Sequence, residues 1–234
     1  MLTALLWGGI AASSLVIGAL AGVGRDWNAR LIGLVLGFGA GALVASISFE
    51  LAEEGFHVGG AVPVALGLAV GGVAFFLADM GVARIGGRGT GAAGLPLALG
   101  ALLDGIPEQA VLGIGIAAGG AVSVSLLVAI FVSNLPEAIG SASDLKAAGT
   151  PRRRIVFGWI AVALLCTLAT LAGYQFQETA GSQLQGGIDG FAAGALLVML
   201  VTSMIPEATE KAREQAGLAA VLGFAVAAGL SLSS

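Results

Sequence analysis

Long apolar stretches separated by short polar linkers run the length of the chain. A helix needs about 20 apolar residues to cross a bilayer, and eight stretches come close to that length. They lie at about residues 2–23, 31–54, 58–80, 95–118, 121–145, 155–177, 186–209 and 215–233. Because the linkers are short, the pattern predicts a single all-α membrane domain of eight transmembrane helices over residues 1–234. The first stretch lacks a basic leader and is too long for a signal peptide, so we expect it to remain as a span.

The composition also indicates a membrane protein. The chain is 57% hydrophobic and only 10% charged, with a mean hydropathy of +1.00, whereas soluble domains carry about 25% charged residues. Lipid is therefore the expected partner, and nothing indicates nucleic-acid binding. The 39 glycines favour close contacts between helices. The one cysteine, Cys166, is expected to be a packed core thiol.

The basic residues predict the orientation of the spans. Every Lys and Arg lies in a linker that follows an odd-numbered span, and none follows an even-numbered one. The ten are Arg25, Arg30, Arg84, Arg88, Lys146, Arg152, Arg153, Arg154, Lys211 and Arg213. The positive-inside rule places such linkers in the cytoplasm. We therefore expect both termini outside and a multi-pass protein of the plasma membrane.

Two internal similarities predict inverted repeats. Residues 37–44 of span 2 match residues 190–197 of span 7, which are 153 positions further on. Residues 104–108 of span 4 match residues 133–137 of span 5, which are 29 positions further on. The members of each pair run in opposite directions, a feature typical of secondary transporters with a binding site near the midplane. A shared glycine-rich composition is the alternative explanation.

Three Pro-Glu pairs interrupt spans 4, 5 and 7, namely Pro107-Glu108, Pro136-Glu137 and Pro206-Glu207. A carboxylate at bilayer depth costs at least about 2.5 kcal/mol, and a proline inside a helix removes a hydrogen bond and kinks it. We expect the three prolines to kink their helices. The repeated pairs predict a polar site shared between helices, although a buried carboxylate can also be neutral and structural.

Helical spacing brings the polar residues of spans 4 and 5 together. Asp104 and Glu108 are four residues apart and share a face, as do Ser133 and Glu137, with Asn134 one residue off that line. These oxygen-bearing side chains surrounded by apolar helices would require a cation or protons to balance the carboxylates. Both possibilities predict a transport protein.

A second set of polar residues is expected to line a path or gate. Glutamates and the only histidine cluster at the outer end of span 2, one glutamine follows the first Pro-Glu pair, and one glutamate lies at the inner end of span 7. These residues are Glu50, Glu53, Glu54, His57, Gln109 and Glu207. Solvated helix ends are the alternative for those near the membrane faces.

The two central motifs resemble those of the ZIP (zinc/iron permease-like) family of divalent-metal transporters. That family typically reads His-Asn-x-Pro-Glu-Gly in span 4 and His-x-x-Pro-Glu in span 5. Here residues 104–109 read Asp-Gly-Ile-Pro-Glu-Gln and residues 133–138 read Ser-Asn-Leu-Pro-Glu-Ala. The chain departs from the family where Asp104 and Ser133 replace histidines, where Gly105 replaces an asparagine, and where a short linker replaces a histidine-rich one.

The resemblance implies alternating access, with spans 1, 4, 5 and 6 moving past spans 2, 3, 7 and 8. It also implies a divalent metal ion as substrate, no resident cofactor, and a homodimer. The metal ligands would be Asp104, Glu108, Ser133, Asn134 and Glu137. An oxygen-only site suits manganese, magnesium or calcium, with zinc and iron retained as candidates. The glycine stripes at 33/37/41 and 186/190/194 could serve either a close contact within the chain or a dimer contact.

Other functions remain as alternatives. The missing motif histidines could mark a carrier of another substrate or a proton-coupled carrier. An intramembrane enzyme is disfavoured, because no GxSG motif occurs and His57 lies near a membrane face. A scaffold without transport would leave the repeated carboxylates unexplained.

Overall fold

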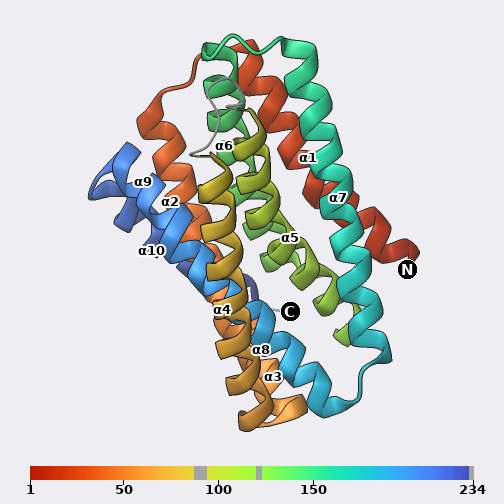
Figure 1. Ribbon diagram of the computed structural model, residues 1–234. Helices are drawn as coiled ribbons and strands as arrows, with labels where there is room; N and C mark the ends of the chain where they lie inside the picture. Colours follow the sequence, from red (N-terminus) through yellow and green to blue (C-terminus); the bar gives the residue numbers. More distant parts are fainter. Residues whose placement is uncertain (87–93, 120–122, 232–234) are drawn as a thin grey trace.

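The computed structural model describes residues 1–86, 94–119 and 123–231, and the regular elements in these ranges are all helical. Figure 1 shows them in order: α1 (Leu2–Gly24), α2 (Ala29–Ser46), the π-helix η1 (Ile47–Ala52), α3 (Glu53–Gly59), α4 (Ala61–Gly86), α5 (Gly94–Gly119), α6 (Val124–Ala147), α7 (Arg152–Thr179), α8 (Ser182–Met199), the π-helix η2 (Leu200–Met204), α9 (Ile205–Ala212) and α10 (Gln215–Ser231). The elements α2, η1 and α3 follow one another without a break, as do α8, η2 and α9. The described chain therefore forms eight helical rods, as the hydrophobic pattern predicts.

The rods extend beyond several of the predicted spans. The second rod runs over Ala29–Gly59 and the seventh over Ser182–Ala212, because their polar last turns remain helical after the apolar stretch has ended. Gly60, with a φ of 83°, then turns the chain into α4. The first residues expected for span 5 and the last ones expected for span 8 lie outside the described residues, as does Arg88.

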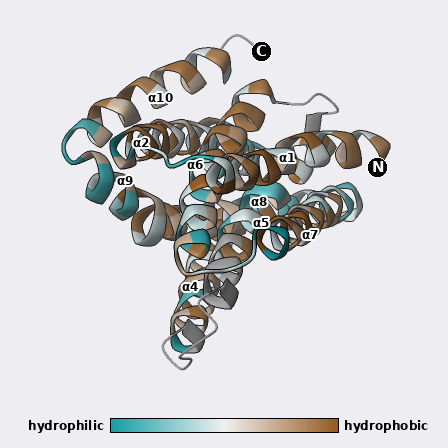
Figure 2. Ribbon diagram, turned by 90° about the horizontal axis from the view of Figure 1, so that it is seen from above, coloured by the Kyte–Doolittle hydropathy of each residue, from teal (hydrophilic) through white to brown (hydrophobic). Residues whose placement is uncertain are grey.

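Six of the described helices are long and apolar enough, by length and composition, to cross a membrane. The helix α10 is apolar but has only 17 residues, and α5 is not one of the six. Large apolar side chains are exposed along α1, α4, α7 and α10, among them Leu6, Leu66, Val70, Leu164, Leu168, Leu218 and Val221. Figure 2 shows hydrophobic colouring along these peripheral helices. The chain thus has the character of a multi-pass membrane protein.

The rods pack as two groups. In the first helix group, α1 packs on α6 and α7, and α5 packs on α7. In the second helix group, α2 packs on α10, and α4 packs on α8. The groups meet mainly where α2 lies against α6. This division places spans 1, 4, 5 and 6 in one group and spans 2, 3, 7 and 8 in the other.

Both glycine stripes serve contacts inside the chain. A Cβ atom added to Gly37 would lie 2.6 Å from the carbonyl oxygen of Ala216, and one on Gly41 would overlap the carbonyl oxygen of Ala220. On the other stripe, a Cβ atom on Gly194 would overlap the carbonyl oxygen of Leu68. The first stripe therefore seats α10 on α2, and the second seats α4 on α8.

The second and seventh rods change geometry at matching positions. Their first helices begin at Ala29 and Ser182, which are 153 residues apart. Their π-helices begin at Ile47 and Leu200, again 153 residues apart. This is the same spacing as the sequence match between the two rods. The π-helices themselves were not expected from the sequence.

Candidate functional site

The first Pro-Glu motif meets the second where α5 crosses α6. The Ser133 hydroxyl on α6 lies 3.1 Å from Oε1 of Glu108 on α5, within hydrogen-bonding distance, and 3.0 Å from the carbonyl oxygen of Ile130. Ser133 is fully buried and Glu108 is 1% exposed. A serine hydroxyl has one hydrogen to donate, so the carboxylate of Glu108 and the carbonyl oxygen of Ile130 compete for this donor.

The helix α2 covers the same point from the second helix group. A Cβ atom on Gly39 would lie 3.0 Å from the Cα atom of Ser133, which is tighter than most Cβ contacts, so the glycine favours this close approach. The neighbouring Asn134 is also buried, and its Nδ2 atom has no hydrogen-bond partner. The α5–α6 contact therefore offers a carboxylate, a hydroxyl and an amide with bonding capacity to spare.

The remaining carboxylates of the site line a small cavity between the two helix groups. The cavity is bounded by residues of α2, α5, α6, α8, η2 and α9, namely Leu36, Asp104, Glu137, Met199, Ser203, Met204 and Glu207. The Ser203 hydroxyl donates to Oδ2 of Asp104 over 2.9 Å. Glu207 forms an ion pair with Lys211 at 2.8 Å, one helical turn further along α9.

This arrangement differs in one respect from the pairing expected by helix face. Asp104 and Glu137 point into the cavity, whereas Glu108 and Ser133 pair with each other beside it. In the part of the chain that the structure describes, no three His, Cys, Asp or Glu side chains lie close enough together to hold a metal ion. The oxygen ligands expected from the sequence are thus neighbours in two small sets, rather than one closed coordination sphere.

The prolines occupy two kinds of position. Pro107 and Pro136 lie inside α5 and α6, as expected for helix-kinking residues. Pro206 is instead the second residue of α9, directly after η2. The rod is continuous here, so the missing N–H of Pro206 leaves a backbone carbonyl of the preceding turn without its usual donor, at the point where the helix geometry changes.

Among the path residues, Glu50 lies on η1 and connects three elements. Its Oε1 atom accepts hydrogen bonds from Ser123 at 2.8 Å, from Ser231 at 3.3 Å, and from Ser125. Its Oε2 atom is buried without a partner. These serines were not singled out from the sequence, because nothing in their local pattern reports that α6, α10 and η1 meet.

The other path residues have different surroundings. Glu53, Glu54 and His57 are exposed on α3, where His57 lies 3.9 Å from Glu53. Gln109 is fully buried between α5 and α7 and accepts a hydrogen bond from Thr170 at 2.6 Å. Gln109 does not line the carboxylate cavity.

The position where the family motif has an asparagine is closely packed. A Cβ atom on Gly105 would lie 2.8 Å from the sulfur of Cys166 on α7. Cys166 is fully buried, which confirms the expected packed thiol. A larger residue at position 105 would therefore require Cys166 to shift, a constraint that the motif alone does not reveal.

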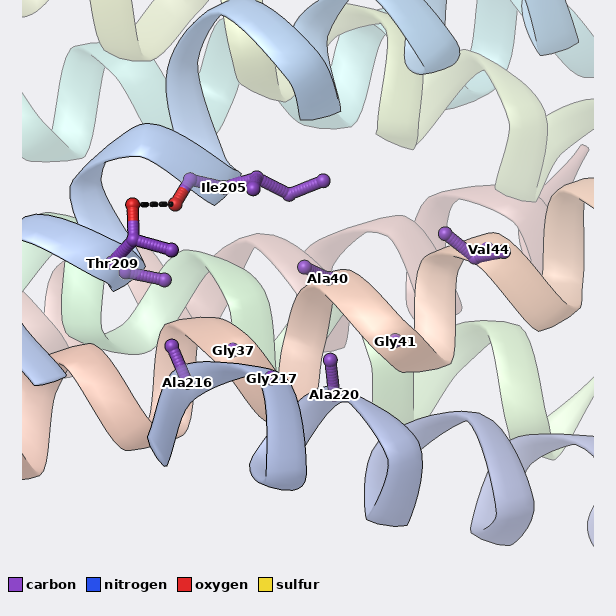
Figure 3. Close-up of a pocket in the computed structure, with 10 residues that line it drawn as sticks. Gly37, Ala40, Gly41, Val44, Ile205, Thr209, Ala216, Gly217 and Ala220 are labelled. Atoms are coloured by element: carbon purple, nitrogen blue, oxygen red, sulfur yellow. Dashed lines mark hydrogen bonds between the residues drawn. The ribbon is translucent and has the colours of Figure 1, made fainter. Parts of the chain in front are cut away.

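A separate pocket lies between α2, α9 and α10 and has a different character. Its lining is apolar or small, as Figure 3 shows, and comprises Gly37, Ala40, Gly41, Val44, Ile205, Ala208, Thr209, Ala216, Gly217 and Ala220. The Thr209 hydroxyl is turned to the backbone oxygen of Ile205 at 2.9 Å. This pocket offers no charged ligand, so the candidate site is the carboxylate cavity.

A comparison with protein-family models and with curated proteins finds no match to this chain.

Proposed function

We propose that the chain is a ZIP-like transporter of divalent metal cations that works by alternating access. The observation that carries this proposal is the position of Asp104, Glu137 and Glu207 around one cavity between the two helix groups. A site at the boundary between two packed groups can be opened to either side by a movement of one group against the other. The proposal extends to residence in the plasma membrane and to a homodimer, as the resemblance implies.

The chemistry of the lining supports a cation as the substrate. Carboxylates in apolar surroundings are costly unless a positive charge compensates them. We assign metal binding to the oxygens of Asp104, Glu108, Ser133, Asn134 and Glu137. Side-chain rotations that bring the two small sets together would provide carboxylate, hydroxyl and amide oxygens, a combination suited to manganese, magnesium or calcium, while iron and zinc also bind carboxylates.

The register of the second and seventh rods supports an inverted repeat. The start of each rod and the start of each π-helix are separated by 153 residues, as are the matching sequences. The contacts follow the same relation, because α10 lies on α2 as α4 lies on α8. If the basic linkers lie in the cytoplasm, as the positive-inside rule predicts, both termini of the proposed transporter are outside and the carboxylate cavity lies between its two halves.

Metal binding can be tested by thermal unfolding of the purified protein in detergent. Manganese, iron(II), zinc, cobalt and cadmium are added in turn, and at least one should raise the Tm, because a ligand that binds only the folded state stabilises it. The Asp104→Asn and Glu108→Gln variants should lose most of that rise. Glu210→Gln, a change at an exposed carboxylate on α9, is the matched control. Equal stabilisation of Glu108→Gln and wild type, or none by any metal, contradicts the proposal.

A proton-coupled carrier is the second candidate, and one observation favours it. Asp104 and Glu108 each have a serine hydroxyl as partner, at 2.9 and 3.1 Å, an arrangement that also suits carboxyl groups that gain and lose protons. Uptake driven by a pH gradient in metal-free vesicles would support this candidate, whereas metal-dependent flux would support the first.

A further inference from the structure

A buried carboxylate outside the candidate site has one oxygen without a hydrogen-bond partner. Asp189 on α8 is 2% exposed, and its Oδ2 atom has no hydrogen bond. Gln177 on α7 is likewise 2% exposed, and its Oε1 atom has no hydrogen bond. An unmade hydrogen bond at a buried polar group costs about 1–3 kcal/mol, and more for a charged one. Two acceptors are therefore left without a donor in the same region.

The surroundings of Asp189 add negative charge instead of compensating it. The Gln177 side chain is a hydrogen-bonding neighbour of Asp189, and the Glu54 carboxylate is near enough to repel it electrostatically. The helix α3 passes close by, because a Cβ atom on Gly55 would lie 3.1 Å from the Cβ atom of Asp189. His57 on the same helix is directed to Glu53.

No basic side chain neutralises this cluster. Within the described ranges, the basic and acidic side chains that lie within 4.0 Å of one another are His57 with Glu53, Lys146 with Asp26, and Lys211 with Glu207. These ion pairs do not include Asp189 or Glu54. A buried carboxylate beside a second carboxylate, with an amide oxygen free to coordinate, is a ligand set for a hard cation.

We propose that Asp189, Gln177 and Glu54 form a second cation-binding site, which takes a hard divalent cation such as manganese or calcium. Two carboxylates balance the charge of such an ion, and the amide oxygen and water complete its oxygen coordination. Asp189 precedes the cavity residue Met199 by ten positions on α8, which corresponds to about 15 Å along the helix. The site is therefore separate from the carboxylate cavity, and it binds its ion whether or not the protein transports metal.

The position of this second site gives a bound ion a structural consequence. Gln177 belongs to α7 in the first helix group, whereas Asp189 and Glu54 belong to the second. An ion held by all three would link the two groups at the end of the bundle that carries the α3–α4 turn and the α7–α8 linker, opposite the α1–α2 and α6–α7 linkers (Figure 1). Occupancy should therefore stabilise the arrangement of the groups described above.

Manganese binding measured by electron paramagnetic resonance tests the proposal, because the signal of free aqueous Mn²⁺ is lost on binding. The full-length protein is titrated with MnCl₂ in detergent. The Asp189→Asn variant should bind one equivalent fewer than wild type, and Glu54→Gln should weaken the same equivalent by about tenfold. Glu178→Gln, which removes an exposed carboxylate next to Gln177, should bind as wild type does. Asp189→Asn should also lose one bound manganese equivalent when it is introduced into the Glu108→Gln variant.

Thermal unfolding of the same proteins provides a second readout that does not depend on counting ions. In metal-free buffer Asp189→Asn should have a higher Tm than wild type, because the substitution removes a buried negative charge that no ion pair compensates, and added manganese should narrow the difference in Tm. Manganese binding and Tm values that are the same in Asp189→Asn and wild type would overturn the second site. If only Glu108→Gln loses a bound manganese equivalent, the second site is overturned and the proposed function is left intact. If only Asp189→Asn loses a bound manganese equivalent, the second site is supported and the proposed function is contradicted.

Discussion

At the scale of single residues, hydroxyl groups decide which buried polar atoms are satisfied. Ser133 serves Glu108, Ser203 serves Asp104, and Thr170 serves Gln109. Each hydroxyl comes from a different helix than the group it serves, so these bonds connect helices within apolar surroundings. Such bonds between membrane helices contribute modestly, about 0.6 kcal/mol on average and up to about 2, but leaving a buried acceptor without its donor costs more.

Removal of the Thr170 hydroxyl should destabilise the α5–α7 contact. Thr170→Val keeps the shape of the side chain but leaves Oε1 of Gln109 without its donor, and Nε2 of Gln109 already lacks a partner. We expect a loss of about 1–3 kcal/mol, seen as a lower Tm in detergent. Thr170→Ser retains the hydroxyl and should lose much less. Equal losses in the two variants would show that packing, and not this hydrogen bond, dominates.

A double-mutant cycle should reveal the contact between Gly105 and Cys166. Gly105→Ala alone places a methyl group 2.8 Å from the sulfur, and overpacking of this kind costs about 1–3 kcal/mol. In a Cys166→Ala background the same change should cost clearly less, because the sulfur is gone. Thermal unfolding of the four proteins measures the coupling. Strictly additive effects would contradict the assigned contact.

The sequence allowed some of these residues to be predicted, and local spacing explains which ones. Positions four apart on a helix share a face, which singled out Asp104 and Glu108 from the sequence, although in the structure Asp104 lines the cavity and Glu108 pairs with Ser133 beside it. The partner Ser203 could not be predicted, because the approach of η2 to α5 depends on packing between distant segments. The burial of Asp189 could not be predicted either. Its near-complete burial depends on α3 and α7, which its own neighbours in sequence do not report.

At the scale of the elements, small residues set how closely the rods pack. The stripe on α2 and the stripe on α8 each bring a backbone carbonyl of the facing helix into contact. The hydrophobic pattern predicted the eight rods, because twenty apolar residues can satisfy their backbone only as a helix in lipid. It did not predict η1 and η2. A π-helix has about one extra residue per turn but leaves the apolar run unbroken, so the hydrophobic pattern does not reveal it. The two rods also differ in sequence at the matching position after the π-helix, which is Glu53 in the second rod and Pro206 in the seventh.

A methyl group on either stripe should force two helices apart. Gly41→Ala and Gly194→Ala each direct a Cβ atom onto a backbone carbonyl oxygen, of Ala220 and Leu68 respectively. Since backbone cannot move aside as a flexible side chain does, we expect a loss of about 1–3 kcal/mol or more in each case. Gly9→Ala is the matched control, because nothing lies within 4 Å of its added Cβ atom. Unfolding temperatures that fall equally in all three variants would contradict the close contacts.

At the scale of the whole molecule, the proposed transport path depends on the two helix groups and on their orientation in the membrane. Among the described linkers, the α1–α2 and α6–α7 linkers, which carry basic residues, lie at the opposite end of the bundle from the α3–α4 turn and the α7–α8 linker, which have none (Figure 1). The sequence predicted this separation from charge alone. It could not predict how the groups meet, because the α2–α6 contact at Gly39 and Ser133 joins segments almost a hundred residues apart.

Cysteine labelling in intact cells should reveal the orientation. A membrane-impermeant maleimide should label Gly181→Cys, in the α7–α8 linker, and should not label Ala148→Cys, which follows the last residue of α6, until the cells are opened. Both positions are exposed, and the native Cys166 is fully buried and should stay unlabelled. The reverse labelling pattern would invert the proposed topology and with it the direction of the path.

Metal flux into proteoliposomes tests the central claim most directly. Purified protein is reconstituted around a metal-sensitive dye, and manganese, zinc or iron(II) is added outside. The account predicts uptake by wild type and by the exposed-site control Glu210→Gln, and at least a tenfold loss of the rate in Glu108→Gln and in Asp104→Asn, because these two changes remove charge from the proposed metal ligands. Uptake of no metal by the wild type, or equal uptake by wild type and Glu108→Gln, would contradict the account.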